Sequence, residues 1–202
     1  MIIRSVEFAG AVATTGGPLP GDLPQVAFSG RSNVGKSSLI NVLLQRTRKK
    51  MAHVSAKPGK TQTLNFYLVN HRFFLVDLPG FGFAHAPGPV REGWREMVEW
   101  YLSGSPALHG VVHLVDGRHP PSALDLDMMT YLGELGLPTL VVLTKMDRVA
   151  RGKVRGTVEA ASKILRVDPD QILPFSSRTR EGREPLLEAV EHLLLSSGGE
   201  EL

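Results

Sequence analysis

A glycine-rich stretch near the N-terminus has the residue types and spacing of a phosphate-binding loop. It runs Gly30-Arg-Ser-Asn-Val-Gly-Lys-Ser37 and matches the pattern G-x-x-x-x-G-K-S. Glycine lets a backbone approach a polyphosphate closely, and successive N–H groups at a helix start can hold the anion. Lys36 can reach the β- and γ-phosphates, and the Ser37 hydroxyl can bind Mg²⁺. A solvated surface turn would not explain the apolar runs on both sides. The predicted phosphate contacts are Gly30, Arg31, Ser32, Asn33, Val34, Gly35, Lys36 and Ser37.

A second candidate follows the apolar run 72–77. In Asp77-Leu-Pro-Gly80 the carboxylate can hold Mg²⁺ through water, and the Gly80 N–H can reach a terminal phosphate. An isolated D-x-x-G is equally consistent with an ordinary turn. Its place after a buried strand, downstream of the phosphate loop, favours a functional role. The predicted contacts in this segment are Asp77, Leu78, Pro79 and Gly80.

A third candidate could select the base. Asp147 follows the apolar run 139–143, and a carboxylate there can accept hydrogen bonds from the N1–H and N2 amino groups of guanine. Adenine lacks that pair of donors, so Asp147 is the predicted guanine selector. Alternatively, Asp147 caps a helix. The stem of Lys145 can lie along the base, and backbone N–H groups near residue 176 could approach guanine O6. The predicted contacts are Thr144, Lys145, Met146, Asp147, Phe175, Ser176 and Ser177.

Strands alternating with helices must position these segments. In an open α/β sheet, ligands bind outside the carboxyl ends of the strands, which is where the three candidates fall. The sequence predicts a three-layer α/β fold with a six-stranded, mostly parallel sheet, one antiparallel strand and an N-terminal edge strand over 2–8. The predicted strands are 25–29, 63–69, 72–77, 111–115, 139–143 and 172–175. The predicted helices are 38–44, 91–102, 122–135, 151–166 and 185–195.

The helix over 122–135 has the clearest signals. Ser122 and Asp125 form a capping box, and Gly136 is placed to end the helix. An apolar stripe at helical spacing is predicted to face inward. Its members are Leu124, Met128, Leu132 and Leu135.

Composition limits the class of protein. The chain has 202 residues, 42% of them hydrophobic, and a formal net charge of +3. It has no cysteine, which excludes a disulfide framework and a thiolate metal site. We expect one domain over 1–202, with a strand and linker over 1–24 and a frayed tail over 196–202. With no apolar run of membrane-spanning length and no signal peptide, we expect a cytoplasmic protein without membrane contact.

The ordered segments look like those of translation-factor-class GTPases. With Lys57-Pro-Gly-Lys-Thr-Gln-Thr-Leu-Asn-Phe66 and Asp77-Leu-Pro-Gly-Phe-Gly-Phe83, the chain closely resembles the EngB (YihA/YsxC) family of ribosome-biogenesis GTP-binding proteins, in the TrmE-Era-EngA-EngB-Septin-like superfamily. The resemblance implies a phosphate-loop GTPase fold, binding of GTP and GDP with Mg²⁺, and a role in large-subunit assembly and in cell division and septation. It makes Thr61 the switch threonine that binds Mg²⁺, and Thr144 replaces the asparagine common in other GTPases. The implied first-switch contacts are Gly59, Lys60, Thr61, Gln62 and Thr63.

Catalysis looks incomplete. Many small GTPases have glutamine after the D-x-x-G glycine to orient the attacking water, and this chain has Phe81. Slow intrinsic hydrolysis is expected, with Lys36, Thr61 and Gly80 as the catalytic contacts. Asn33 resembles the asparagine of potassium-stimulated GTPases, which helps to hold K⁺ where other enzymes place an arginine. Alternatively, Asn33 only closes the loop by hydrogen bonds.

Basic residues gather in two places and favour an rRNA partner, although the second group is equally consistent with a solvated surface. The favoured interpretation is a monomeric GTPase that acts as a switch on the large ribosomal subunit. A phosphate-loop kinase acting on a small acceptor is the main alternative, and an interaction module with a structural nucleotide is another. The first basic group comprises Arg46, Arg48, Lys49, Lys50, Lys57 and Lys60, and the second Arg148, Arg151, Lys153 and Arg155.

Overall fold

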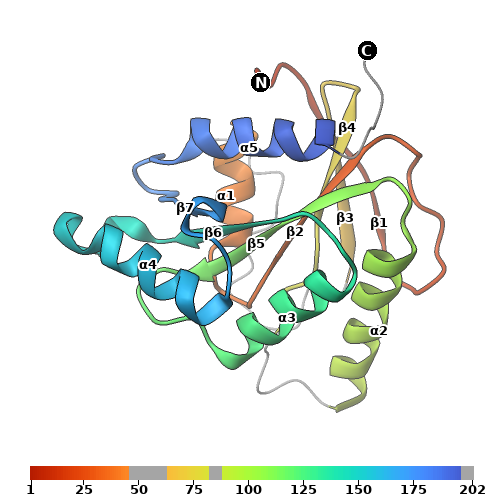
Figure 1. Cartoon of the computed structure of the whole chain (residues 1–202). Coiled ribbons are helices and arrows are strands. Elements are labelled where there is room, and N and C mark those ends of the chain that lie inside the picture. The colour runs from red at the N-terminus through yellow and green to blue at the C-terminus, as the bar shows by residue number, and fades with distance from the viewer. Residues whose placement is uncertain (46–62, 82–87, 197–202) are drawn as a thin grey trace.

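The computed structural model describes residues 1–45, 63–81 and 88–196. In this part of the chain seven strands form one sheet, in the order β1-β3-β4-β2-β5-β6-β7 (Figure 1). The strands are β1 Val6–Val12, β2 Gln25–Gly30, β3 Leu64–Val69, β4 Phe73–Asp77, β5 Leu108–Asp116, β6 Thr139–Thr144 and β7 Ile172–Pro174. The predicted first-switch contacts 59–62 and the basic run 46–50 lie outside the described residues, and so does the predicted tail after 196.

Helices cover both faces of the sheet (Figure 1). They are α1 Lys36–Leu43, α2 Gly88–Gly104, α3 Ala123–Glu134, α4 Val154–Leu165 and α5 Arg183–Ser196, with short 3₁₀ turns η1 Met146–Arg148, η2 Arg151–Lys153 and η3 Pro169–Gln171. Apolar side chains of α1 and α5 pack on one face, and those of α2, α3 and α4 on the other. The three-layer prediction is confirmed. Among the described residues, no helix combines the length and the apolar character needed to cross a membrane.

The direction of the strands also follows the prediction. β4, β2, β5, β6 and β7 run parallel, and β3 is antiparallel to β4. The hairpin reverses at Asn70 and His71, whose φ angles of 52° and 55° are left-handed. After β2 the chain builds β3 and β4 on one side and then β5 on the other. Because ligands bind where strand order reverses, the carboxyl end of β2 is the expected binding edge.

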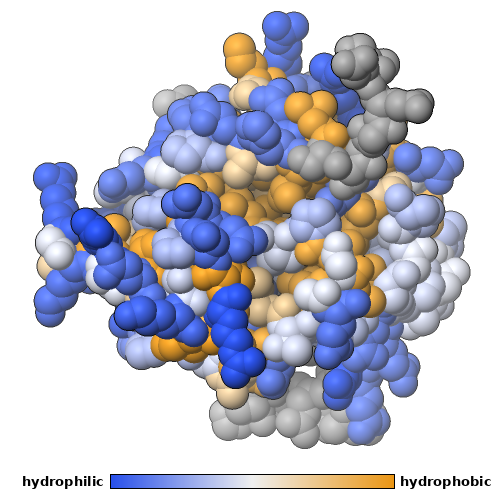
Figure 2. All heavy atoms as spheres, in the orientation of Figure 1, coloured by the Kyte–Doolittle hydropathy of each residue, from blue (hydrophilic) through white to orange (hydrophobic). Residues whose placement is uncertain are grey.

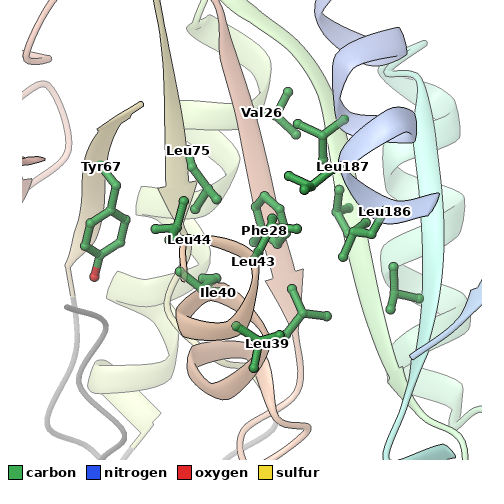
Figure 3. Close-up of a cluster of buried hydrophobic side chains, with 14 of the residues drawn as sticks. Val26, Phe28, Leu39, Ile40, Leu43, Leu44, Tyr67, Leu75, Leu186 and Leu187 are labelled. Carbon is green, nitrogen blue, oxygen red and sulfur yellow. The ribbon is translucent and has the colours of Figure 1, made fainter. Parts of the chain in front are cut away.

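A packed core fixes the phosphate loop between strand and helix. All six residues of β2 are buried, and Leu39 and Ile40 of α1 are 0% exposed. Figure 3 shows the α1 side chains directed toward Phe28 of β2, with Leu186 and Leu187 of α5 completing the cluster. Both ends of the loop are therefore anchored in this core.

Several element boundaries and the placement of Leu124 differ from the sequence predictions, and two of these differences have a clear physical reason. The N-terminal strand spans Val6–Val12 rather than 2–8, and it pairs antiparallel with β3 across an irregularity between Phe8 and Gly10. It is shifted because Val6 and Val12 are the residues that reach the core. In α3, Leu124 is 43% exposed, so its predicted inward placement is wrong. Asp125, Met129 and Leu132 form the buried face instead, which rotates the helix away from Leu124.

Candidate functional site

The phosphate loop has the backbone shape that its sequence predicts. Gly35 has φ 107° and sits at the N-cap of α1, a conformation that a side chain would disfavour. Asn33 also lies in the left-handed region, at φ 62°, where asparagine is among the better tolerated residues. Because α1 begins at Lys36, its first N–H groups lack intrahelical partners and are available to an anion.

The segment after β4 lies along this loop. The Ser32 N–H donates to the Phe81 carbonyl at 2.9 Å, and the Phe81 N–H donates to the Gly30 carbonyl at 3.3 Å. A Cβ at residue 80 would lie 3.2 Å from both the Cα and the N of Ser32, so Gly80 is needed for this close approach. Gly80 and Phe81 are therefore held against the phosphate loop, which places the Gly80 segment at the predicted phosphate end of the site.

Lys36 and Asp77 meet at the centre of the site. The Lys36 ammonium forms an ion pair with Asp77 Oδ1, and the two side chains are only 10% and 8% exposed. Asp77 pairs across the hairpin with Asn65. Thr63, just before β3, donates its hydroxyl to Asn65 Oδ1 at 3.2 Å and so lies at the same edge. Two predicted ligands of phosphate and Mg²⁺ thus neutralise each other in this structure.

Thr144 and Lys145 tie the phosphate loop to the strands beside it. The buried Thr144 hydroxyl donates to the Val34 carbonyl at 2.6 Å and lies 3.2 Å from the Val115 carbonyl oxygen. The Lys145 ammonium donates to the Asn33 carbonyl at 2.7 Å and to Asp116 Oδ2 at 2.8 Å. Thr144 therefore supports the loop from within rather than presenting its hydroxyl to a base.

Sequence reasoning misses Asp116, the residue that holds Lys145 from the other side. Partial burial opposes ionisation of Asp116, but hydrogen bonds from Arg118 and Lys145 outweigh it and keep the pKa of the carboxyl well below its usual range. The signal was present, because Asp116 ends the buried strand β5 as Asp77 ends β4. Its charge fixes the position of Lys145 beside the loop.

Asp147 lies between two donors at the same edge. Its Oδ1 accepts a hydrogen bond from the Ser176 hydroxyl at 2.8 Å, and its Oδ2 lies 3.0 Å from Arg178 Nε. The bond from Ser176, followed by the charge of Arg178, lowers the pKa of the Asp147 carboxyl. Lys145, not Asp147, is at the N-cap of η1, so the structure does not support the helix-cap alternative. Arg178 carried no signal in the sequence that set it apart from other surface arginines.

The last predicted segment is only partly available to a ligand. The Phe175 N–H donates to the Leu143 carbonyl at 2.8 Å, and the Ser176 N–H donates to the Glu181 carbonyl at 3.0 Å. Within the described ranges, the Ser177 N–H has no hydrogen-bond partner and is the remaining donor of the three. Some other predicted contacts are also limited to their backbones, because their side chains are buried: Val34, Leu78, Pro79, Met146 and Phe175.

Segments 30–37, 77–80, 144–147 and 175–177 thus meet at the carboxyl edge of the sheet. A family model described as a 50S ribosome-binding GTPase matches residues 25–145, which include the loop, Asp77 and Lys145. The chain is therefore a GTPase of the phosphate-loop class, and the kinase alternative falls away. Within that class it belongs to the EngB family of GTP-binding proteins, as the following relatives show.

A probable GTP-binding protein EngB of Gemmatimonas aurantiaca is 47% identical over 195 residues, covering 96% of this chain and 95% of the relative. The corresponding Bacillus subtilis protein is 43% identical over 175 residues, 86% of this chain and 89% of the relative. A crystal structure of a probable EngB protein has a TM-score of 0.70 at 25% identity, covering 85% of this chain and 99% of that one. Era in complex with MgGDPNP and a segment of 16S ribosomal RNA has a TM-score of 0.68 at 22% identity, covering 89% and 59%, and shares the fold.

Proposed function

We propose that this chain binds GTP and GDP at the carboxyl edge of its sheet and works as a nucleotide-dependent switch in assembly of the large ribosomal subunit. The observation that carries the nucleotide site is a link made by Lys145. Its ammonium donates to the Asn33 carbonyl of the phosphate loop, and Lys145 itself immediately precedes η1, the turn that contains Asp147. Guanine would meet Asp147 and the Ser177 N–H, and the phosphates would meet the loop and Lys36.

Mg²⁺ fits the chemistry of the residues at the phosphate end. Ser37 and Asp77 provide hard oxygen atoms, the ligand type that Mg²⁺ prefers, and Thr61 is the third proposed ligand. The described residues contain no group of three or more His, Cys, Asp or Glu side chains that could hold a metal. The ion would therefore take most of its ligands from phosphate oxygens and water. It would supply positive charge against the phosphates, and Lys36 would leave Asp77 for the nucleotide.

Hydrolysis would be slow without an activator, because Phe81 cannot orient a water molecule as glutamine does. Asn33 is exposed at the mouth of the loop, and no described residue hydrogen-bonds its side chain. This fits a role toward a monovalent cation, although its left-handed φ alone also favours asparagine. We expect faster turnover in K⁺ than in Na⁺ at equal ionic strength, and loss of this difference in Asn33→Ala. Turnover indifferent to the cation would leave Asn33 a structural role only.

The proposed ribosomal role is supported by the description of the matching family and by the basic residues near the site. A cytoplasmic monomer that alternates between GTP and GDP on a large-subunit precursor fits this role, and effects on cell division and septation would follow from failed assembly. Figure 2 shows hydrophilic side chains projecting over α4 and the turns before it, where Arg151 and Lys153 are exposed. Such a surface could contact rRNA phosphates.

Two measurements test the proposal. Competition titration should show strong preference for guanosine over adenosine nucleotides, and equal affinity for ATP and GTP would contradict the proposed base site. Co-sedimentation with isolated large subunits should differ between GDP and a non-hydrolysable GTP analogue, with isolated small subunits as the control. Binding that ignores the nucleotide, or that is equal for the two subunits, would remove the ribosomal role and leave the GTPase class intact.

A further inference from the structure

Three buried polar side chains, Ser29, His113 and Asp125, form a polar cluster beside the phosphate loop. His113 of β5 is 0% exposed, and its Nδ1 lies 2.8 Å from the hydroxyl of Ser29, the residue before Gly30. Its Nε2 lies 3.8 Å from Oδ1 of Asp125 in α3. The three residues come from three elements and lie in an otherwise apolar layer, so no pattern in the sequence groups them.

The positions of the nitrogen and oxygen atoms indicate how this polar cluster is protonated. His113 Nε2 and Asp125 Oδ1 are both buried, and neither has a hydrogen-bond partner among the described residues. Asp125 Oδ2 is already engaged, because it accepts bonds from the N–H and the hydroxyl of Ser122 at 2.8 and 2.7 Å. A proton on His113 Nε2 points toward the Asp125 carboxylate, and because 3.8 Å is too long for a hydrogen bond this contact is electrostatic. Nδ1 then accepts a hydrogen bond from the Ser29 hydroxyl. Burial lowers the pKa of His113 to about 4, against the opposing charge of Asp125, so the ring is neutral near pH 7.

Serine, histidine and aspartate together suggest a nucleophilic triad, but the geometry excludes one here. Ser29 and Asp125 are 1% and 3% exposed, so no substrate carbonyl can reach the hydroxyl. The aspartate is also committed to the capping box of α3. Ser29 and Asp125 therefore hold the His113 ring in place, and the polar cluster does not activate a nucleophile.

What the ring touches is Phe81. The two rings are stacked, with centroids 5.9 Å apart and planes 10° from parallel. The same Phe81 is bonded through its backbone to Ser32 and Gly30 of the phosphate loop. Phe81 is thus held on one side by the loop and on the other by a fully buried ring, whose Nδ1 is hydrogen-bonded to Ser29 and whose Nε2 faces Asp125.

We propose that His113 is a positioning residue for GTP hydrolysis, whose fixed ring sets where Phe81 and the adjacent Gly80 lie over the phosphate loop. The inference rests on the proposed contact between Gly80 and the terminal phosphate. In this enzyme Phe81 cannot orient water by hydrogen bonds, and its ring instead serves as the anchor that places the Gly80 N–H. The buried side chain of His113 thereby affects GTP hydrolysis at the edge of the sheet. Because GDP has no terminal phosphate for Gly80 to contact, His113 should not affect GDP binding.

The test is a double-mutant cycle in the full-length protein. His113→Gln keeps an acceptor for Ser29 and a donor for Asp125 but lacks the ring, and Phe81→Leu removes the other half of the stack. At saturating GTP and Mg²⁺, we expect each variant to hydrolyse roughly tenfold more slowly than the wild type, as expected from a small misplacement of reacting groups. The double variant should be no slower than either single variant, because both remove the same contact. GDP affinity should stay within about twofold of the wild type.

Two further variants separate positioning from general damage. His113→Phe keeps a ring against which Phe81 can stack but lacks the two nitrogens that face Ser29 and Asp125, so it should lower stability yet keep more of the rate than His113→Gln. Val111→Ala, a buried truncation two residues earlier on the same strand, should lower stability without slowing hydrolysis selectively. Additive effects in the cycle, an unchanged rate in His113→Gln, or a loss of GDP affinity matching the loss of rate would each overturn the inference. A wild-type protein that fails to bind GTP would instead defeat the proposed function itself.

Discussion

At the scale of single residues, the proposed guanine selector Asp147 has its carboxylate held in place by its neighbours. Ser176 holds one carboxylate oxygen and Arg178 lies against the other. In Asp147→Asn the amide would present a donor where guanine also has donors, so GTP should bind more weakly and xanthosine triphosphate, with its additional oxygen, should bind better. The loss for GTP should be on the order of 3 kcal/mol. Competition titration with both nucleotides measures the change.

The matched control for this exchange is Asp127→Asn, which makes the same chemical change at an exposed position of α3. It should leave both affinities unchanged. If Asp147→Asn bound GTP as tightly as the wild type, another residue would have to read the base.

Thr144 offers a second residue-scale prediction. Thr144→Val keeps the side-chain shape but leaves the buried Val34 carbonyl without the donor at 2.6 Å. We expect the free energy of unfolding to fall by about 1–3 kcal/mol and nucleotide affinity to fall with it, because the loop loses its internal support. Thr139→Val is the control, since Thr139 also donates to a carbonyl, that of Leu137 at 2.9 Å, but at the opposite end of β6. Urea denaturation and nucleotide titration of both variants decide the matter; a Thr144 variant that loses no more affinity than Thr139→Val would contradict it.

Candidate site residues at strand ends could be predicted from the sequence, whereas contacts between polar side chains inside buried strands could not. Asp77 and Asp147 follow apolar runs, and the rule that ligands bind at carboxyl ends places them together. Ser29 and His113 lie inside such runs, and their contact joins positions 84 residues apart in the chain. Local patterning predicts that a strand is buried but not which polar side chain meets another across the sheet.

At the scale of elements, α3 shows how a capping residue can also be a core residue. Asp125 closes the capping box with Ser122 and is at the same time buried beside His113. The hydrophobic stripe alone predicted Leu124 as an inward residue, because the pattern does not reveal that an aspartate occupies the buried face. In the same way, β1 extends to Val12 through Ala9, Gly10 and Ala11, which have little intrinsic preference for strands, because β3 provides pairing partners.

The stability of α3 should depend on that box. Ser122→Ala removes the hydroxyl that bonds Asp125, and we expect a loss of about 1 kcal/mol in the free energy of unfolding. Thr130→Ala, an exposed substitution within the same helix, should be neutral or slightly stabilising because alanine is the better helix former. Thermal and urea denaturation compare the two. A Ser122 variant as stable as Thr130→Ala would show that the box contributes nothing measurable.

At the scale of the whole molecule, the buried histidine should make stability depend on pH. The pKa of His113 is about 4 in the folded chain, below its usual value of 6.5, mainly because burial disfavours the charged ring. Between these values the unfolded chain binds the proton and the folded chain does not, so stability falls as the pH falls. From about pH 7 to about pH 5 this group should remove about 2 kcal/mol. Urea denaturation of the wild type and of His113→Gln should show a smaller decrease in the variant, and parallel decreases would contradict the assignment.

The distribution of charge over the whole molecule leads to the last prediction. The net charge of +3 is modest, so rRNA binding would have to come from local groups. Arg151 and Lys153 are exposed in η2, whereas the charge of Arg155 is offset by Glu159 at 2.8 Å. Changing both Arg151 and Lys153 to glutamine should weaken large-subunit binding and reduce its dependence on salt by about two units of slope, whereas Arg155→Gln should change it much less. The measurement is co-sedimentation over a range of NaCl concentrations. The comparison is a variant in which Arg48, Lys49 and Lys50 are replaced. If that variant binds the large subunit more weakly while the Arg151 and Lys153 double variant keeps the wild-type salt dependence, the contact belongs to the first basic group instead.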